Sequence, residues 1–169
     1  MHKIKTAAEL IAEIPAMLHY YPKESVILMT YRFDALGNQV SEMMMRTELH
    51  RLHDPEVLDQ ANQMLSDMEA EVVLAVVVTE ALDPDITALK CIRNLEMVWQ
   101  TREICEGEAY QAIWSTLSPT YFLHAGDHDL LSGRITPVNR AHSTHELLSR
   151  GEYIHPTRDE YAYALLKGD

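Results

Sequence analysis

Residues 6–32 read T-A-A-E-L-I-A-E-I-P-A-M-L-H-Y-Y-P-K-E-S-V-I-L-M-T-Y-R, and they combine a helical pattern, two prolines and an apolar strand pattern. Thr6 followed by Glu9 forms a capping box, which predicts the start of a helix. Apolar side chains then recur at helical spacing along one stripe, and they are Leu10, Ile11, Ile14, Met17 and Leu18. We therefore expect a short amphipathic helix at this end of the chain.

Two prolines and a buried strand follow this stripe. Pro15 and Pro22 are expected to form a corner, because proline disrupts a helix and extends the residue before it. The run Ser25–Met29 is almost purely apolar, which is typical of a strand covered on both faces. A turn at Asp34–Asn38 then predicts a second strand over Gln39–Thr47, antiparallel to the first.

The rest of the chain alternates helical and strand patterns. In order, the predicted elements are a helix from Asp54-Pro55 to about Glu69, a strand over Val72–Val78, a helix from Asp83, a strand over Tyr110–Leu117, a hairpin of Tyr121–His124 and Leu130–Ile135, and two short helices capped by Ser143 with Glu146 and by Thr157 with Glu160. Strands separated by helices are expected to run parallel, and strands separated by turns antiparallel. The sequence therefore predicts an α/β fold, a single domain over residues 1–169 with a mixed β-sheet of about five to six strands and helices on both faces.

Composition narrows the classes of partner. The formal net charge is −12 and no run of basic residues occurs, which argues against nucleic acid or an anionic membrane as the main partner. The strongly apolar run Val72–Val78 is too short to cross a bilayer.

Cys91 and Cys105 are the two cysteines, and on one straight helix they lie too far apart for a disulfide. We expect free thiols and a cytoplasmic location.

Three separated motifs resemble one family. They are Ile14-Pro15-x-x-Leu18-x-Tyr20-x-Pro22-x-Glu24-Ser25-Val26-Ile27, Arg46-x-Glu48-Leu49 and Gly151-x-x-x-x-Pro156-x-Arg158. Together they are similar to an uncharacterised actinobacterial family of unknown function, family 4192. His19 and His50 depart from its pattern, since they stand where the family has a glycine and a proline. The resemblance implies an architecture and supplies no activity.

The predicted topology places polar residues at one edge of the sheet. If the second, third and fourth strands are parallel, their carboxyl ends meet the beginning of the reversed first strand, where ligands of open α/β sheets tend to bind. The candidate ligand-binding residues at this edge are Lys23, Ser25, Arg46, Glu48, Thr79 and Glu80, and Glu24 is expected beside them. Lys23 and Arg46 would hold a small anion or nucleotide, and the carboxylates would orient it or a metal. The alternative is that these residues form structural ion pairs and hydrogen bonds alone.

A second candidate site lies in the predicted hairpin. His124 and His128 would face each other across the turn, and with Asp127 they could hold zinc or another divalent ion. The alternative is a polar turn exposed to water, since the spacing follows no strict ligand pattern.

No pattern of a known catalytic centre occurs: the sequence lacks a G-x-S-x-G elbow, a phosphate-binding G-x-x-x-x-G-K loop, a G-x-G-x-x-G fingerprint and a C-x-x-C pair. No catalytic residue and no cofactor are therefore assigned, and the sequence leans away from an enzyme.

We expect a small acidic interaction or regulatory protein that forms a homodimer or binds another protein. The alternative hypothesis is a ligand-binding or hydrolytic protein that uses the edge around Ser25 and Arg46.

Overall fold

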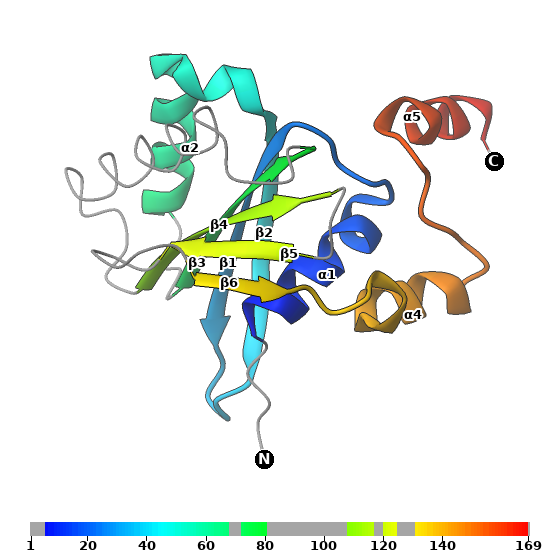
Figure 1. Cartoon of the computed structure of the whole chain (residues 1–169), viewed down its shortest axis with the longest axis horizontal. Coiled ribbons are helices and arrows are strands. Elements are labelled where there is room, and N and C mark those ends of the chain that lie inside the picture. The colour runs from blue at the N-terminus through cyan, green and yellow to red at the C-terminus, as the bar shows by residue number, and fades with distance from the viewer. Residues whose placement is uncertain (1–5, 68–71, 81–107, 117–119, 125–130, 169) are drawn as a thin grey trace. The chain divides into compact units, whose positions relative to one another are not determined.

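The computed structural model describes residues 6–67, 72–80, 108–116, 120–124 and 131–168, which form a β-sheet, α-helices and short 3-10 helices (Figure 1). The helices are α1 (Ala7–Leu18), α2 (Pro55–Asp67), α4 (His142–Ser149) and α5 (Arg158–Lys167), with short 3-10 helices η1 (Leu49–His53) and η2 (Val138–Arg140). The strands are β1 (Ser25–Phe33), β2 (Gln39–Glu48), β3 (Val72–Thr79), β4 (Glu108–Ser115), β5 (Thr120–His124) and β6 (Leu131–Arg134).

The chain divides into two compact units. The first comprises residues 1–4 and 24–133 and contains the sheet and α2, whereas the second comprises residues 5–23 and 134–169 and contains α1, η2, α4 and α5.

The sheet of the first unit is mixed and has the strand order β2-β1-β3-β4-β5-β6. β1 pairs antiparallel with both β2 and β3, so β2 and β3 point the same way. β3 pairs parallel with β4, and β4 pairs antiparallel with β5. The α/β class, the mixed sheet and the predicted directions of β1 to β5 are confirmed.

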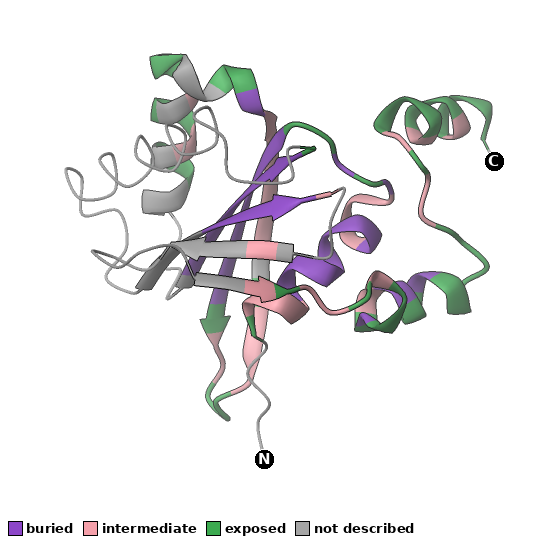
Figure 2. Cartoon of the chain, in the orientation of Figure 1, coloured by how far each residue is buried: buried purple, intermediate pink, exposed green. Residues whose placement is uncertain are grey.

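The centre of the sheet is apolar because its strands carry β-branched and other apolar side chains toward both faces. Val26, Ile27 and Met29 of β1 are at most 1% exposed, and the run Val73–Val78 of β3 is at most 3% exposed. Figure 2 shows this burial along the neighbouring central strands. The indole Nε1 of Trp114 on β4 is also buried, and it finds no hydrogen-bond partner among the described residues.

The second unit is organised around α1, whose residues Leu10–Ala16 are buried. Thr6 caps the helix, and its Oγ1 accepts a hydrogen bond from the backbone N–H of Glu9 at 3.3 Å, as the capping box predicts. α1 packs against α4 and η2. The buried side chain of Glu13 accepts a hydrogen bond from the backbone N–H of Ser143 at 3.4 Å, so a carboxylate of α1 lies at the N-terminus of α4.

Two local predictions are wrong. Pro15 lies inside α1 and not in the corner, because that helix continues to Leu18 and ends where His19 adopts the left-handed conformation with φ of 72°. Ser143 does not cap α4, because the helix begins at His142 and Ala141 is its N-cap. Glu13 supplies a polar group at this helix start instead.

Other local predictions are confirmed. Asp54 accepts a hydrogen bond from the N–H of Glu56 at the start of α2, and Thr157 caps α5 through the N–H of Glu160. The predicted helix from Asp83, both cysteines and the tip of the predicted hairpin lie outside the described residues. Within the described ranges, no helix is both long and apolar enough to cross a membrane.

Candidate functional site

The strand ends meet at one edge of the sheet, as the sequence predicts. Ser25 at the start of β1 pairs with Glu48 at the end of β2 and with Val78 near the end of β3. Thr79 at the end of β3 pairs with Ser115 at the end of β4. We refer to Glu24, Ser25, Arg46, Glu48, Thr79 and Glu80 as the strand-end edge.

Three of these residues share one face of the sheet. Residues paired directly across strands point to the same face, and that face alternates along each strand. The register therefore places Ser25, Arg46 and Glu48 together. The guanidinium Nε of Arg46 donates a hydrogen bond to Ser25 Oγ at 3.1 Å, and Ser25 is fully buried. Glu48 extends toward solvent, where its Oε2 lies 3.3 Å from His50 Nε2.

On the opposite face, Glu24 accepts the hydrogen bonds that connect the strand ends. Thr79 donates a hydrogen bond from Oγ1 to Glu24 Oε1 at 3.3 Å, and the same oxygen accepts the backbone N–H of Glu80 at 2.7 Å. The carbonyl of Glu24 accepts the N–H of Leu49 at 2.9 Å, which also ties the end of β2 to the start of β1. Glu24 has φ of 39°, a conformation that L-residues other than glycine seldom adopt.

The strand-end edge is therefore split between two faces, and most of its described contacts join one strand to the next. Arg46 is accompanied by the carboxylates of Glu24, Glu48 and Glu80, so this edge carries more negative than positive charge. Lys23, which the sequence analysis adds to the site, is exposed and belongs to the second unit. Glu80 enters the contacts described above through its backbone N–H.

Glu24 lies at this edge, as its place before the first strand predicts, but it is not among the predicted ligand-binding residues. One sequence signal was available, since Glu24 directly precedes the buried strand inside the family-like motif. Its bonds to Thr79 and Glu80 join residues about 55 positions apart and depend on the pairing of β1 with β3.

The predicted metal site is described in part. His124 ends β5, where it pairs with Gln111 of β4. Asp127 and His128 lie outside the described residues. Within the part of the chain that the structure describes, no group of three or more His, Cys, Asp or Glu side chains is arranged to hold a metal ion.

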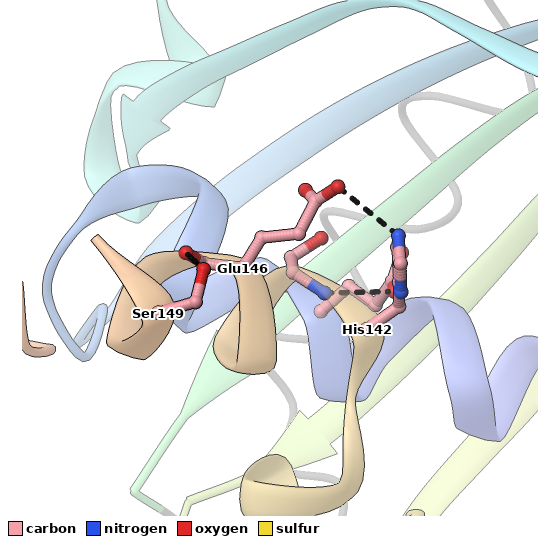
Figure 3. A network of polar contacts seen from close by, with 5 residues as sticks. His142, Glu146 and Ser149 are labelled. Carbon is pink, nitrogen blue, oxygen red and sulfur yellow. Dashed lines mark hydrogen bonds and ion pairs between the residues drawn. The ribbon is translucent and has the colours of Figure 1, made fainter.

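The histidine-rich start of α4 is a surface contact. His142 Nε2 lies 3.1 Å from Glu146 Oε1 one helical turn along, and both side chains are exposed (Figure 3). Ser149 donates a hydrogen bond from Oγ to the backbone carbonyl of Glu146 at 2.7 Å. This arrangement stabilises a short helix and brings no third ligand to His142.

α5 differs from α1 and α4 in burial, because none of its residues is buried (Figure 2). Its attachment within the second unit is aromatic: the ring of Tyr161 stacks on His19 with centroids 5.2 Å apart and also contacts Tyr20 and His155. A parallel β-bridge between Tyr20 and His155 joins the two chain segments that carry these rings.

Large apolar side chains on α5 remain in contact with solvent. Tyr163 and Leu165 are each 60% exposed, and Leu166 is 87% exposed. No sequence motif points to this surface, although the capping box of Thr157 predicts the helix. The available signal was the apolar run that follows that cap. The exposed fractions of its side chains show that most of this run faces water.

The fold and these surfaces define an α/β protein with a mixed sheet and a helix that exposes large apolar side chains. Comparison with family models matches residues 8–168 to the family described as Domain of unknown function (DUF4192). The chain belongs to this family, as the three sequence motifs predict. Neither the comparison with curated proteins nor the comparison with solved structures finds a significant match.

Proposed function

We propose that this is a non-catalytic interaction protein of the cytoplasm, and that the outer side of α5 is the surface through which it binds a protein partner. The observation that carries this proposal is the exposure of Tyr163 and Leu166, which share the side of the helix away from Tyr161, on a helix with no buried residue. Large apolar side chains gathered on one exposed element are characteristic of protein-binding surfaces.

The length of α5 supports the same proposal. Isolated helices shorter than about 12–15 residues are marginal in water, and their stability in proteins comes mainly from packing. α5 has 10 residues, and among its described contacts the ring of Tyr161 provides the aromatic anchor. A partner that covers the outer side would add the packing that stabilises this helix.

Site-specific photo-crosslinking tests the proposal. A benzophenone amino acid is placed at Leu166 in one variant and at Leu36 in a matched control, and both are irradiated in the organism that encodes the chain. Leu36 is 71% exposed but lies in the turn between β1 and β2, in the other unit. We expect a discrete protein adduct at position 166 that Tyr163→Asp removes, and none at position 36. The same pattern of adducts at both positions, or none at 166, would count against the proposal.

A second candidate function is the binding of a small anion or nucleotide at the strand-end edge. The hydrogen bond from Arg46 to Ser25 favours it, because it holds a guanidinium near the carboxyl ends of β2, β3 and β4. The carboxylates of Glu24, Glu48 and Glu80 oppose it, because they repel an anion. Thermal-shift measurements with inorganic phosphate, ATP and Mg²⁺ would decide: stabilisation lost in Arg46→Gln supports this function, and an unchanged melting temperature with every probe removes it.

A further inference from the structure

We propose that the partner of α5 is a second copy of this chain, and that two α5 helices pair antiparallel around a two-fold axis. This inference rests on the proposed function and names the partner at the same surface. It is carried by the arrangement of apolar and charged residues on the outer side of the helix.

The outer side carries a stripe suited to helix packing. At about 100° per residue, positions i, i+3, i+4 and i+7 lie on one face of a helix. Asp159, Ala162, Tyr163 and Leu166 have this spacing and are all exposed. Tyr161, the anchor within the second unit, lies on the other side. We call Asp159, Ala162, Tyr163, Leu166 and Lys167 the α5 seam.

The charges at the two ends of the seam select a second copy in the antiparallel orientation. Asp159 lies in the first turn and Lys167 in the last, where its ammonium lies 4.6 Å from the centroid of the Tyr163 ring. In an antiparallel pair centred on Tyr163, Asp159 of each copy faces Lys167 of the other. A parallel pair would place like charges together and would also align the two helix dipoles unfavourably.

The α5 seam also avoids part of the electrostatic repulsion between two copies of this acidic chain. Two copies of a chain with a formal charge of −12 repel each other, so they need a contact surface without excess negative charge. α5 contains Arg158 and Lys167 against Asp159 and Glu160, so its side chains are balanced. An isologous contact through α5 therefore brings together a neutral part of an acidic protein.

The first test is the solution mass of the purified chain. A 10-residue helix offers less area than a standard interface, so we expect a dimer that dissociates on dilution. Light scattering should show the mass rising from 19.3 kDa toward twice that value as concentration increases. Leu166→Asp should abolish the rise, whereas Leu36→Asp, a change at an exposed site in the other unit, should preserve it.

Charge reversal tests the orientation. Asp159→Lys and Lys167→Asp each create two repulsive pairs in an antiparallel homodimer, and each should weaken dimerisation about tenfold. An equimolar mixture of the two variants restores both opposite-charge pairs and should recover the dimer. Circular dichroism of each variant checks that α5 remains helical, since both changes also oppose the helix dipole.

Cysteine crosslinking distinguishes antiparallel from parallel pairing. An oxidised mixture of Asp159→Cys and Lys167→Cys chains should form a mixed disulfide dimer, whereas each variant alone should match the wild-type chain, which controls for Cys91 and Cys105. Self-crosslinking of Asp159→Cys would overturn the antiparallel pair. A chain that stays monomeric at every concentration would overturn self-pairing altogether. In that case an adduct at position 166 with a different protein would still support the proposed function.

Discussion

At the scale of single residues, the corner between α1 and β1 contains two left-handed backbones at His19 and Glu24, with φ of 72° and 39°. Both residues are held by contacts to distant parts of their own unit. His19 stacks on Tyr161 and its carbonyl accepts the N–H of His155, and Glu24 bonds to Thr79 and Glu80. Such contacts offset conformations that are unfavourable for residues with a Cβ atom.

His19 provides a direct test of this balance. His19→Ala removes the stack on Tyr161 and keeps the unfavourable φ, whereas His19→Gly removes the stack and relieves the backbone. We expect the glycine variant to have the higher free energy of unfolding of the two, by about 1 kcal/mol, in urea denaturation. Equal stability of the two variants would show that the left-handed backbone at this position carries no penalty.

At the scale of elements, similar caps serve helices in different surroundings. Thr6 caps α1, whose residues Leu10–Ala16 are buried, and Thr157 caps α5, which has no buried residue. α1 is stabilised mainly by packing, whereas α5 depends more on its cap and on Tyr161. The same substitution at the two caps should therefore have unequal consequences.

Thr157→Ala should fray α5 more than Thr6→Ala frays α1. Loss of an N-cap costs about 1 kcal/mol, which corresponds to roughly a fivefold increase in local opening. Amide hydrogen exchange should therefore accelerate about fivefold along α5 in Thr157→Ala, with little change along α1 in Thr6→Ala. Equal acceleration in the two helices would contradict the view that α5 lacks packing.

The edge strand β2 illustrates how an element departs from a regular pattern. Thr30 pairs with Met43 but Tyr31 pairs with Ser41, so Glu42 is the extra residue of a β-bulge. A bulge on an edge strand interrupts the regular hydrogen-bond ladder, which opposes further strand pairing at that edge. The sheet is therefore poorly suited to self-association through β2, which is consistent with α5 as the proposed contact.

At the scale of the whole molecule, net charge is the dominant feature of the composition. The chain has 26 acidic and 14 basic residues, and such an excess destabilises a compact state through self-repulsion. Salt screens exposed charges over a Debye length of about 10 Å at 0.1 M. The stability of this protein should therefore depend on ionic strength.

We expect the melting temperature to rise by a few degrees between about 10 mM and 200 mM sodium chloride, measured by differential scanning fluorimetry. Potassium chloride at the same ionic strength should give the same curve, because screening does not depend on the identity of the cation. A melting temperature that falls with salt would indicate that attractive ion pairs outweigh the net repulsion.

The sequence alone determined the order of the described elements, the directions of β1 to β5, the caps at Thr6, Asp54 and Thr157 and the family, because these depend on local patterns and on short connections. The tertiary structure decided which strand-end residues share a face, because a single bulge or register shift reverses the side-chain direction. It also decided that Glu24 joins three strand ends, that His19 turns left-handed and that the apolar residues of α5 face water. These features arise from hydrogen bonds and burial between residues far apart in the chain, and no local pattern specifies them.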